Sequence, residues 1–285
     1  MDGIIIVNKP KGITSRDVVN IVCKKLNTKK VGHTGTLDPI ATGVLVITIG
    51  KATKLVDIIT SDDKEYIAEV KLGVLTDTYD ITGNIIRKEK YILDKNKLET
   101  ALYSFVGSYK QEVPIYSAVK INGKKLYEYA RNNEKVELPK RTVEIKEIEL
   151  LETGNDYYKF QVTVSKGTYI RSLIKDINDK LGIIGVMSNL IRIRQGQFFI
   201  DKSYTIDDIE DNNYKLLSIN DVLKDKNCVT IDDNMYKLIK NGSIIDNVYK
   251  KDIITFIYDN NVVAIYKKYD KDNTKIKPYK MFVWG

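Results

Sequence analysis

Apolar runs and alternating apolar and polar residues predict strands along much of the chain. Residues 3–9 and 44–50 are nearly continuous apolar runs, which are typical of buried strands. Residues 157–165 alternate, so one face of that strand is predicted to be apolar. The side chains on that face are Tyr158, Phe160, Val162 and Val164. Further strands are expected at 65–73, 83–90 and 143–153.

Between these strands, apolar residues spaced three or four apart predict helices. Thr14 or Ser15 can cap the first helix, because a hydroxyl oxygen accepts the free N–H groups of a first turn. Gly182 is expected to end the last one. The helices expected from this spacing span 14–27, 51–62 and 167–182, together with one that begins after Asp94.

Strands and helices are interspersed without the regular spacing of βαβ units. This order favours an α+β fold with a mixed, mainly antiparallel sheet flanked by helices. The acidic stretch 201–227 is a candidate linker. Beyond it, residues 228–285 hold short apolar runs separated by Asn, Gly and Asp turns, which predicts a small β-rich second domain.

The composition is that of a globular protein, with 43% hydrophobic and 29% charged residues in a chain of 285. No run of eighteen apolar residues is present, so the sequence predicts no membrane span. The first residues lack the basic start of a signal peptide and soon reach Pro10. Cys23 and Cys228 lie in distant segments, which predicts neither a disulfide framework nor a metal site. These features predict a cytoplasmic protein.

The net charge of +8 is unevenly distributed. Residues 1–50 are basic, with seven Lys and Arg against three Asp, whereas residues 201–227 are acidic, with four Lys against seven Asp and Glu. A basic body suits a polyanionic partner, and nucleic acid is the first candidate. Charge alone does not separate RNA from DNA or from an anionic membrane.

Several kinds of site lack their sequence motifs. The Gly50-Lys51 pair has neither the spacing nor the hydroxyl residue of a phosphate-binding loop, and no Gly-rich dinucleotide motif follows a strand. A Ser-His-Asp triad would have to use His33, the only histidine, and no nucleophile elbow is present. One histidine and two remote cysteines argue against zinc, although carboxylates could hold magnesium.

The stretch GHTGTLDPIATGVL, residues 32–45, points to an aspartate-centred site. Pro39 biases Asp38 toward extended backbone, which can aim its carboxylate outward from a rigid loop. The alternative is a plain Asp-Pro turn, in which Asp38 accepts backbone N–H bonds.

This stretch resembles the catalytic motif of the tRNA pseudouridine synthase B family, RNA-modifying enzymes that act on uridine-55 in the T-loop of tRNA. In that family the aspartate of the motif is catalytic, which implies the same role for Asp38. Arg171 could pair with it and hold it ionised. The resemblance covers nearly the whole chain, strongly to about residue 200 and more weakly beyond it. Other segments that carry it are NKPKGITS (8–15), KEYIAEVKLG (64–73), LTDTYDITG (75–83), VPIYSAVKINGKKLYEYAR (113–131), SKGTYIRSLIKDI (165–177) and NLIRIRQGQF (189–198).

The resemblance also implies which residues hold the target base. Tyr66 is expected to stack on the uracil, Tyr169 and Arg171 to line its pocket, and Leu190 to place an apolar side chain against it. Periodicity alone would assign both tyrosines and Leu190 to the core. His33 is expected to fill the space that a flipped base leaves, or to contact a phosphate.

Two parts of the chain depart from the family pattern. In NLIRIRQGQF, Ile191 and Ile193 stand where the family usually has arginine and threonine, although Arg192 and Arg194 keep the strand basic. The C-terminal match is looser and rests on IKNGSIID and KIKPYKMFV. It implies a small RNA-binding domain of the PUA type.

The resemblance implies a pseudouridine synthase fold in residues 1–222 and a PUA-like domain in 228–285, with a mobile RNA-gripping loop at about 120–140. It implies base flipping and catalysis by an aspartate, without cofactor or metal. The expected partner is the T-arm stem-loop of tRNA, and neither DNA nor a membrane. We expect the chain to be a monomer in the cytoplasm.

Two other functions fit parts of the sequence. A related pseudouridine synthase could act on ribosomal RNA through guide RNAs, but the chain lacks the long basic tail common in those proteins. A non-catalytic RNA-binding protein or RNA-folding chaperone would suit the basic charge and the 19 tyrosines. Such a binder would gain nothing from a carboxylate at residue 38, because phosphates repel it.

Overall fold

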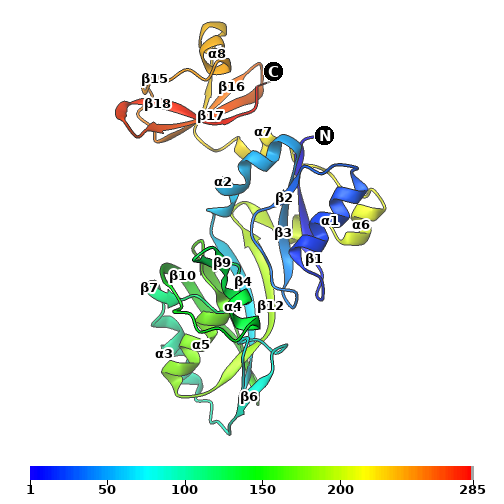
Figure 1. Ribbon diagram of the computed structural model, residues 1–285, viewed down its shortest axis with the longest axis vertical. Coiled ribbons are helices and arrows are strands. Elements are labelled where there is room, and N and C mark those ends of the chain that lie inside the picture. Colours follow the sequence, from blue (N-terminus) through cyan, green and yellow to red (C-terminus); the bar gives the residue numbers. More distant parts are fainter. Residues whose placement is uncertain (284–285) are drawn as a thin grey trace.

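A nine-stranded sheet with helices packed on it forms most of the molecule (Figure 1). The computed structural model describes residues 1–283 of the 285-residue chain. A separate five-stranded sheet forms the C-terminal part. The predicted α+β fold, with a mixed, mainly antiparallel sheet and a small β-rich C-terminal domain, is confirmed. No helix within residues 1–283 combines the length and the apolar character needed to cross a membrane.

The large sheet has the strand order β1-β3-β12-β4-β11-β10-β7, with β2 paired to β3 and β13 paired to β12. In β4, successive side chains alternate between buried and more exposed, as expected of a sheet with one face on the core. The strands are β1 Gly3–Lys9, β2 Val31–His33, β3 Thr42–Ile49, β4 Lys64–Leu72, β7 Gly107–Glu112, β10 Lys140–Thr153, β11 Tyr157–Val164, β12 Gly185–Gln195 and β13 Phe198–Phe199.

The sheet contains one parallel pairing, between β3 and β12, while its other strands pair antiparallel. In this junction, which we call the seam, Thr42 lies opposite Ile191 and Gly43 opposite Arg192. Gly43 has φ +97°, and a Cβ there would lie 2.3 Å from the carbonyl oxygen of Arg192. Only glycine fits this position, since it tolerates both the positive φ and the close backbone approach.

Helices cover the sheet through their apolar faces, as the sequence predicted. Thr14 caps the first of them in a capping box with Asp17, and Gly182 ends α5 at φ +66°. The expected helix at 51–62 is instead a 3-10 helix followed by a short α-helix. The hydroxyl of Thr53 donates to the carbonyl of Gly50, which competes with regular helical bonding. The helices of this part are α1 Ser15–Lys25, η1 Gly50–Leu55, α2 Val56–Thr60, α3 Lys95–Tyr103 and α5 Ile170–Leu181.

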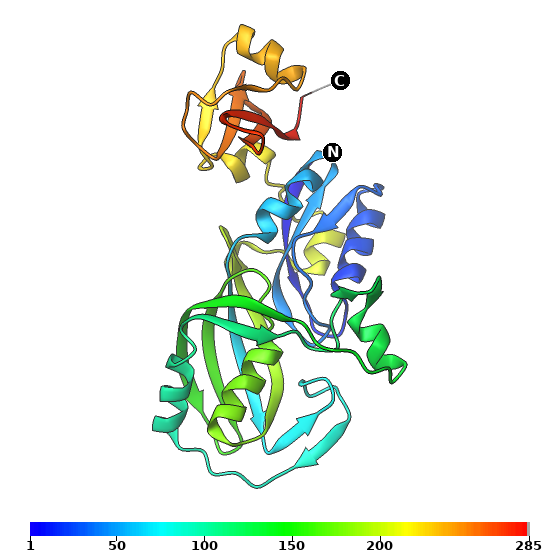
Figure 2. The same ribbon diagram turned by 60° about the vertical axis from the view of Figure 1, so that its left-hand side comes forward.

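Two excursions leave the sheet, one after β4 and one after the edge strand β7. One is a hairpin of β5 (Val74–Thr76) and β6 (Ile85–Lys88). The other, which we call the arm, spans residues 113–139 and holds β8 (Lys120–Ile121), β9 (Lys124–Lys125) and α4 (Leu126–Arg131). Figure 2 shows the arm in green and the hairpin in cyan projecting from the sheet on the same side.

The acidic stretch proposed as a linker contains ordered elements that pack on the large sheet. Ile4 of β1 and Leu217 exchange backbone hydrogen bonds, and Ile209, Val222 and Leu223 are buried. The stretch therefore contributes to the core. Its elements are η2 Ile200–Lys202, α6 Ile206–Glu210 and α7 Ile219–Leu223.

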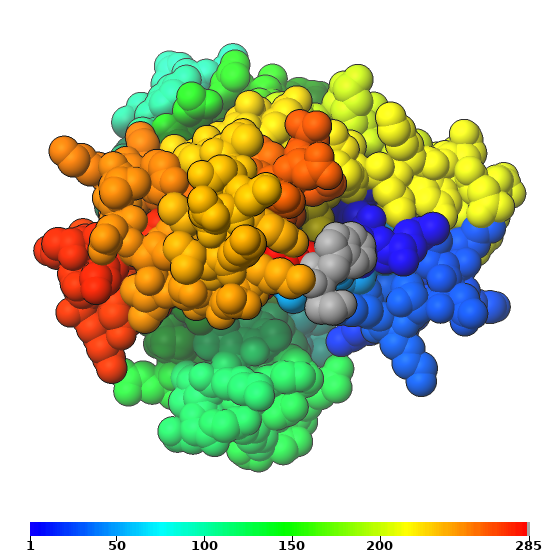
Figure 3. Space-filling view, turned by 90° about the horizontal axis from the view of Figure 1, so that it is seen from above, coloured from blue at the N-terminus to red at the C-terminus, as the bar shows by residue number. Residues whose placement is uncertain are grey.

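The small C-terminal sheet has the order β14-β16-β17-β18-β15 and its own apolar core around Phe256 and Tyr266. Viewed down the long axis of the molecule, this part (orange and red) lies above one end of the large domain (Figure 3). Its elements are β14 Cys228–Thr230, α8 Asp233–Lys240, β15 Ile245–Asp246, β16 Ile253–Tyr258, β17 Asn261–Tyr269 and β18 Asp272–Met281.

Candidate active site

The loop that carries Asp38 joins β2 to β3 and is fixed from below by two buried side chains. The hydroxyl of Ser15 accepts a hydrogen bond from the N–H of Leu37 at 2.9 Å and donates to its carbonyl at 3.2 Å. The ammonium of Lys9 donates to the carbonyl of Pro39 and to two further carbonyls of its own segment. Asp38 thus lies between two anchored neighbours.

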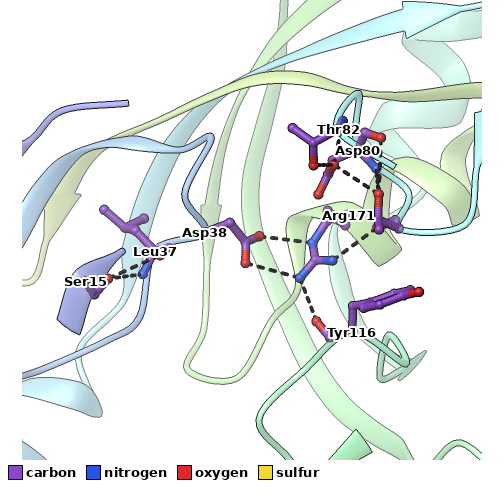
Figure 4. A network of polar contacts seen from close by, with 8 residues as sticks. Ser15, Leu37, Asp38, Asp80, Thr82, Tyr116 and Arg171 are labelled. Carbon is purple, nitrogen blue, oxygen red and sulfur yellow. Dashed lines mark hydrogen bonds and ion pairs between the residues drawn. The ribbon is translucent and has the colours of Figure 1, made fainter. Parts of the chain in front are cut away.

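Asp38 meets Arg171 in a two-pronged ion pair (Figure 4). Nε of Arg171 lies 3.0 Å from Oδ2 of Asp38, and Nη2 lies 3.2 Å from Oδ1. Arg171 stands in the first turn of α5 and is 6% exposed, whereas the Asp38 side chain keeps 35% of its surface accessible. The fork orients the carboxylate while leaving part of it open to a ligand.

Burial raises the pKa of the Asp38 carboxyl above its ordinary value, because a charged carboxylate loses water there. The guanidinium of Arg171 opposes this rise, and the like charge of Asp80 adds to it. Lys9 also opposes it from beneath the loop. The carboxylate is therefore a stronger base than an exposed aspartate.

The remaining donors of Arg171 tie two other segments to the same guanidinium. Nη1 donates to the carbonyl of Thr78 at 3.1 Å, and Nη2 donates to the carbonyl of Tyr116, at the start of the arm, at 3.0 Å. The Thr78 segment is held by Asp80, whose carboxylate accepts from the hydroxyl of Thr78 and from both the N–H and the hydroxyl of Thr82. Arg171 therefore joins the Asp38 loop, the segment around Asp80 and the arm.

A cavity of about 540 Å³ opens above this ion pair. It is lined by Asp38 and Arg171 and by three further residues that the sequence predicted: Tyr66, Tyr169 and Leu190. Tyr66 is 8% exposed and Leu190 5% exposed, so the cavity wall is made of core residues. An ion pair, two aromatic rings and an apolar side chain suit a flat, partly polar ring such as a nucleobase.

Tyr169 is positioned by a glutamine on a neighbouring strand. The side chain of Gln111, from β7, accepts from the N–H of Tyr169 at 2.8 Å and donates to its carbonyl at 3.1 Å. Gln111 is 1% exposed. This pair of bonds satisfies backbone groups at the start of α5, where no side chain of the helix itself caps the turn.

His33 does not line this cavity. It lies on β2, half-buried, and its Nδ1 accepts a hydrogen bond from the N–H of Gly35 at 3.3 Å. Burial, then the charges of Arg192 and Arg16, lower the pKa of His33. The roles predicted for His33 with a flipped base or a phosphate stay predictions.

The two arginines of the strand that departs from the family pattern are both engaged with the protein. Arg192 is 1% exposed, and it donates to the carbonyls of Val44 and Gly35 at the two ends of the Asp38 loop. Arg194 pairs with Glu65 at 2.7 Å. Arg192 therefore supports the loop from within the sheet.

Sequence reasoning missed the roles of Lys9, Asp80 and Gln111. The first two lie in quoted motifs, at Lys9-Pro10 and in LTDTYDITG, so their motifs carried a signal without indicating a contact. Gln111 lay in an unremarkable strand. Within residues 1–283, no three His, Cys, Asp or Glu side chains cluster as metal ligands would. The expectation of no metal or cofactor stays a prediction.

Comparison with known proteins identifies the family. Residues 23–170, which include Asp38 and the arm, match the family described as TruB family pseudouridylate synthase (N terminal domain). The chain is 38% identical over 300 residues to the tRNA pseudouridine synthase B of Bacillus cytotoxicus, covering 99% of this chain and 98% of that protein. The chain belongs to the TruB family of pseudouridylate synthases. It is therefore an isomerase, as the resemblance in the sequence predicted.

A second TruB-family relative, the tRNA pseudouridine synthase B of Alkaliphilus oremlandii, is 43% identical over 265 residues, covering 92% of this chain and 85% of that one. Among solved structures, a chain of a Cbf5-Nop10-Gar1 complex has a TM-score of 0.71 and 27% identity, covering 93% of this chain and 78% of its own. The match covers most of the chain and confirms a pseudouridine synthase fold followed by a PUA-like domain.

Proposed function

We propose that this protein isomerises uridine-55 in the T-loop of tRNA to pseudouridine, with Asp38 as the catalytic residue. The observation that carries the proposal is the forked pair of Asp38 and Arg171 at the base of a cavity lined by Tyr66, Tyr169 and Leu190. Relatives that match nearly the whole length of this chain are tRNA pseudouridine synthases.

The reaction breaks the bond between N1 of uracil and C1′ of ribose, turns the ring and joins C5 to C1′. The proton on C5 is lost and N1 gains one, so no oxidant or reductant is consumed. Asp38 can attack C1′, attack C6 of the base, or assist elimination to a glycal. Each route needs an ionised carboxylate and a cavity that keeps the detached ring beside the sugar.

The cavity walls provide that confinement. The rings of Tyr66 and Tyr169 offer stacking faces to a flipped base, and Leu190 closes the pocket. Extracting the uridine from its stack costs a few kcal/mol, which contacts to base and backbone recover. Because the carboxylate is held by Arg171, little reorientation is required when the base enters.

The arm and the C-terminal domain extend the surface available to RNA. In the arm, Lys124 lies over the ring of Tyr129 and pairs with Glu134, while Arg131 lies over the ring of Tyr127. Cations at a protein surface, such as the partly exposed Lys124 and the exposed Arg131, neutralise phosphates. We assign residues 1–222 to catalysis, 228–285 to additional RNA binding and 120–140 to a mobile gripping loop. One chain acts alone in the cytoplasm, on RNA and not on DNA.

The test is proton release from C5. Purified protein is incubated without metal or cofactor with unmodified tRNA that carries tritium at C5 of uracil, in parallel with Asp38→Asn. We expect the wild type to release one tritium per tRNA, at uridine-55, and Asp38→Asn to release none while binding tRNA with similar affinity. Near-normal release by Asp38→Asn would contradict the role of Asp38.

Two other outcomes would support the alternative functions. The similarity to a protein of the Cbf5-Nop10-Gar1 complex supports the alternative of an enzyme that depends on partners. Release that requires added RNA or protein partners would favour that reading. Tight tRNA binding with no release from the wild type under any condition would favour a non-catalytic RNA-binding protein.

A further inference from the structure

One wall of the catalytic cavity contains a buried cation without a counter-ion. Lys64, the first residue of β4, lines the cavity and is 7% exposed. Its ammonium donates to the carbonyls of Thr60 and Asp62. The neighbouring carboxylates of Asp62 and Asp63 form ion pairs elsewhere, with Lys226 and with a lysine of β10. Across the described residues, no carboxylate forms an ion pair with Lys64. Buried lysines are rarely found without a partner.

Lys9 shows what a purely structural buried lysine looks like in this protein. Its ammonium is fully buried and donates to three carbonyls, those of Pro10, Ile13 and Pro39. An ammonium has three N–H donors, so Lys9 is satisfied by the protein. Lys64 uses two donors, and nothing in residues 1–283 accepts the third. Lys9 does not line the cavity, whereas Lys64 does.

The cations that line the cavity near Lys64 make this wall positive. Arg192 lines the cavity, is fully buried and bonds only to backbone carbonyls among the described residues. Lys166 is a further lining residue. Burial, followed by the charge of Arg192, lowers the pKa of Lys64 to about 8, and Lys166 adds to this effect while Asp62 and Asp63 oppose it. An anion entering the cavity would find an incompletely neutralised cationic wall.

The position of Lys64 relative to Tyr66 indicates which anion this is. The two side chains point to the same face of β4, where residues two apart are separated by about 6.7 Å. One nucleotide can therefore place its base against Tyr66 and its phosphate against Lys64. RNA supplies such a phosphate at every linkage, and its hydrogen bond to an ammonium is charge-assisted.

We propose that Lys64, with Lys166 at the mouth of the cavity, binds a backbone phosphate adjacent to the target uridine. This inference rests on the proposed function, since it takes the substrate to be RNA with its target base in this cavity. Lys64 is then a substrate-binding residue, and the phosphate is the counter-ion that the folded protein lacks. Flipping the nucleotide brings the two charges together, which recovers part of the cost of unstacking.

The experiment pairs one lysine with one linkage. T-arm stem-loop RNAs carry a neutral methylphosphonate at the linkage either 5′ or 3′ to the target uridine. The ribose before each tested linkage lacks a free 2′-hydroxyl in modified and unmodified RNAs alike, to prevent strand cleavage. Wild type, Lys64→Met and the control Lys9→Met are compared by kcat/KM for tritium release and by Kd for the same RNAs.

We expect Lys64→Met to lower kcat/KM on all-phosphate RNA by roughly 10- to 100-fold, the usual effect of losing a charged hydrogen bond. One of the two methylphosphonates should lower wild-type kcat/KM to a similar extent. Combining that RNA with Lys64→Met should add less than about threefold, because both changes remove the same contact. Any loss in Lys9→Met should multiply with the loss from each methylphosphonate.

Three results would overturn the proposal. The first is a Lys64→Met enzyme within threefold of wild type on all-phosphate RNA. The second is a loss that multiplies with both methylphosphonates, which would make Lys64 a structural residue. The third needs no variant: wild type within threefold on both modified RNAs shows that neither phosphate matters. If the wild type also releases no tritium from unmodified tRNA, the proposed function fails instead, and the same coupling is read from the Kd values.

Discussion

Arg171 holds both carboxylate oxygens of Asp38, although 133 residues separate the two in the chain. The same guanidinium binds the carbonyls of Thr78 and Tyr116, so four segments meet at one planar group. Such a fork fixes the direction of the carboxylate as well as its charge. The direction and the charge state of the Asp38 carboxylate therefore depend on contacts that only the tertiary structure creates.

Replacing Arg171 should change the pH dependence of the reaction. Burial raises the pKa of Asp38, and the charge of Arg171 lowers it. Removing Arg171 should therefore raise the pKa of Asp38 further. In Arg171→Met, activity should therefore be lost at a higher pH on acidification, and kcat should fall by roughly 100-fold or more. Tritium release across pH 4 to 8 measures both. Arg171→Lys, which keeps the charge without the fork, should shift the acidic limb less; equal limbs in all three proteins would contradict the assignment.

Asp80→Asn should move the acidic limb of the pH–activity profile in the opposite direction, to lower pH. Asp80 contributes a like charge that raises the pKa of Asp38, so its neutralisation should lower that pKa and preserve activity to lower pH. The asparagine oxygen can still accept from Thr82, which limits the loss of structure. Thr82→Val, which removes one bond to Asp80 without changing a charge, provides the control. A limb that moves upward in Asp80→Asn would exclude this electrostatic coupling.

Ser15→Ala should destabilise the protein by about 1–3 kcal/mol, because it leaves the N–H and the carbonyl of Leu37 without their buried partner. Chemical denaturation measures the free energy of unfolding. Ser61→Ala removes an exposed serine hydroxyl that bonds one carbonyl at the end of α2, and it should cost less than about 0.5 kcal/mol. Equal losses in the two variants would show that Ser15 does not anchor the loop.

Gly43→Ala should destabilise the fold far more than Gly12→Ala. Both glycines have nearly the same positive φ, +97° and +94°. A Cβ at Gly43 would collide with the backbone of Arg192, whereas one at Gly12 meets nothing within 4 Å. We expect about 1–2 kcal/mol of backbone strain at Gly12 and at least about 3 kcal/mol at Gly43. Similar unfolding midpoints would show that the seam accommodates the added methyl group.

Alkaline pH should stabilise the wild type relative to Lys64→Met. The folded pKa of Lys64 is about 8, against an ordinary value of 10.5, so between these two pH values the unfolded chain binds the additional proton. Stability therefore rises with pH across this window, by at most about 3.5 kcal/mol at 1.4 kcal/mol per pKa unit. Urea denaturation of both proteins at pH 7, 8, 9 and 10 measures the difference. A constant difference would mean that Lys64 titrates normally.

Local features of the sequence were enough to predict many elements. Thr14, Asp94 and Gly182 take the capping positions expected of them, because a cap depends on the residue itself and on its neighbours within one turn. The alternating residues of β11 are buried on the predicted face, since the period of a strand is local as well. The resemblance supplied the cavity residues Tyr66, Tyr169 and Leu190.

Residues whose roles depend on distant contacts could not be predicted in this way. Lys9 is defined by a carbonyl 30 residues away, and Arg192 by carbonyls 148 and 157 residues away. A strand pattern shows that Arg192 belongs to β12 without showing what lies beside it. The roles of Asp80 and Lys64 depend on charges that come near them only after folding.

The parallel pairing of β3 with β12 has a mechanical consequence. The loop of Asp38 belongs to the part of the sheet made of β1, β2 and β3. Arg171 belongs to α5, which packs against β12 in the other part of the sheet. Two paired residues on each strand join β3 to β12 at the seam between these two parts. The distance between Asp38 and Arg171 therefore depends on how these two parts of the sheet are oriented relative to each other. We expect an RNA that contacts both parts of the sheet to fix this orientation, and with it the alignment of the Asp38 carboxylate.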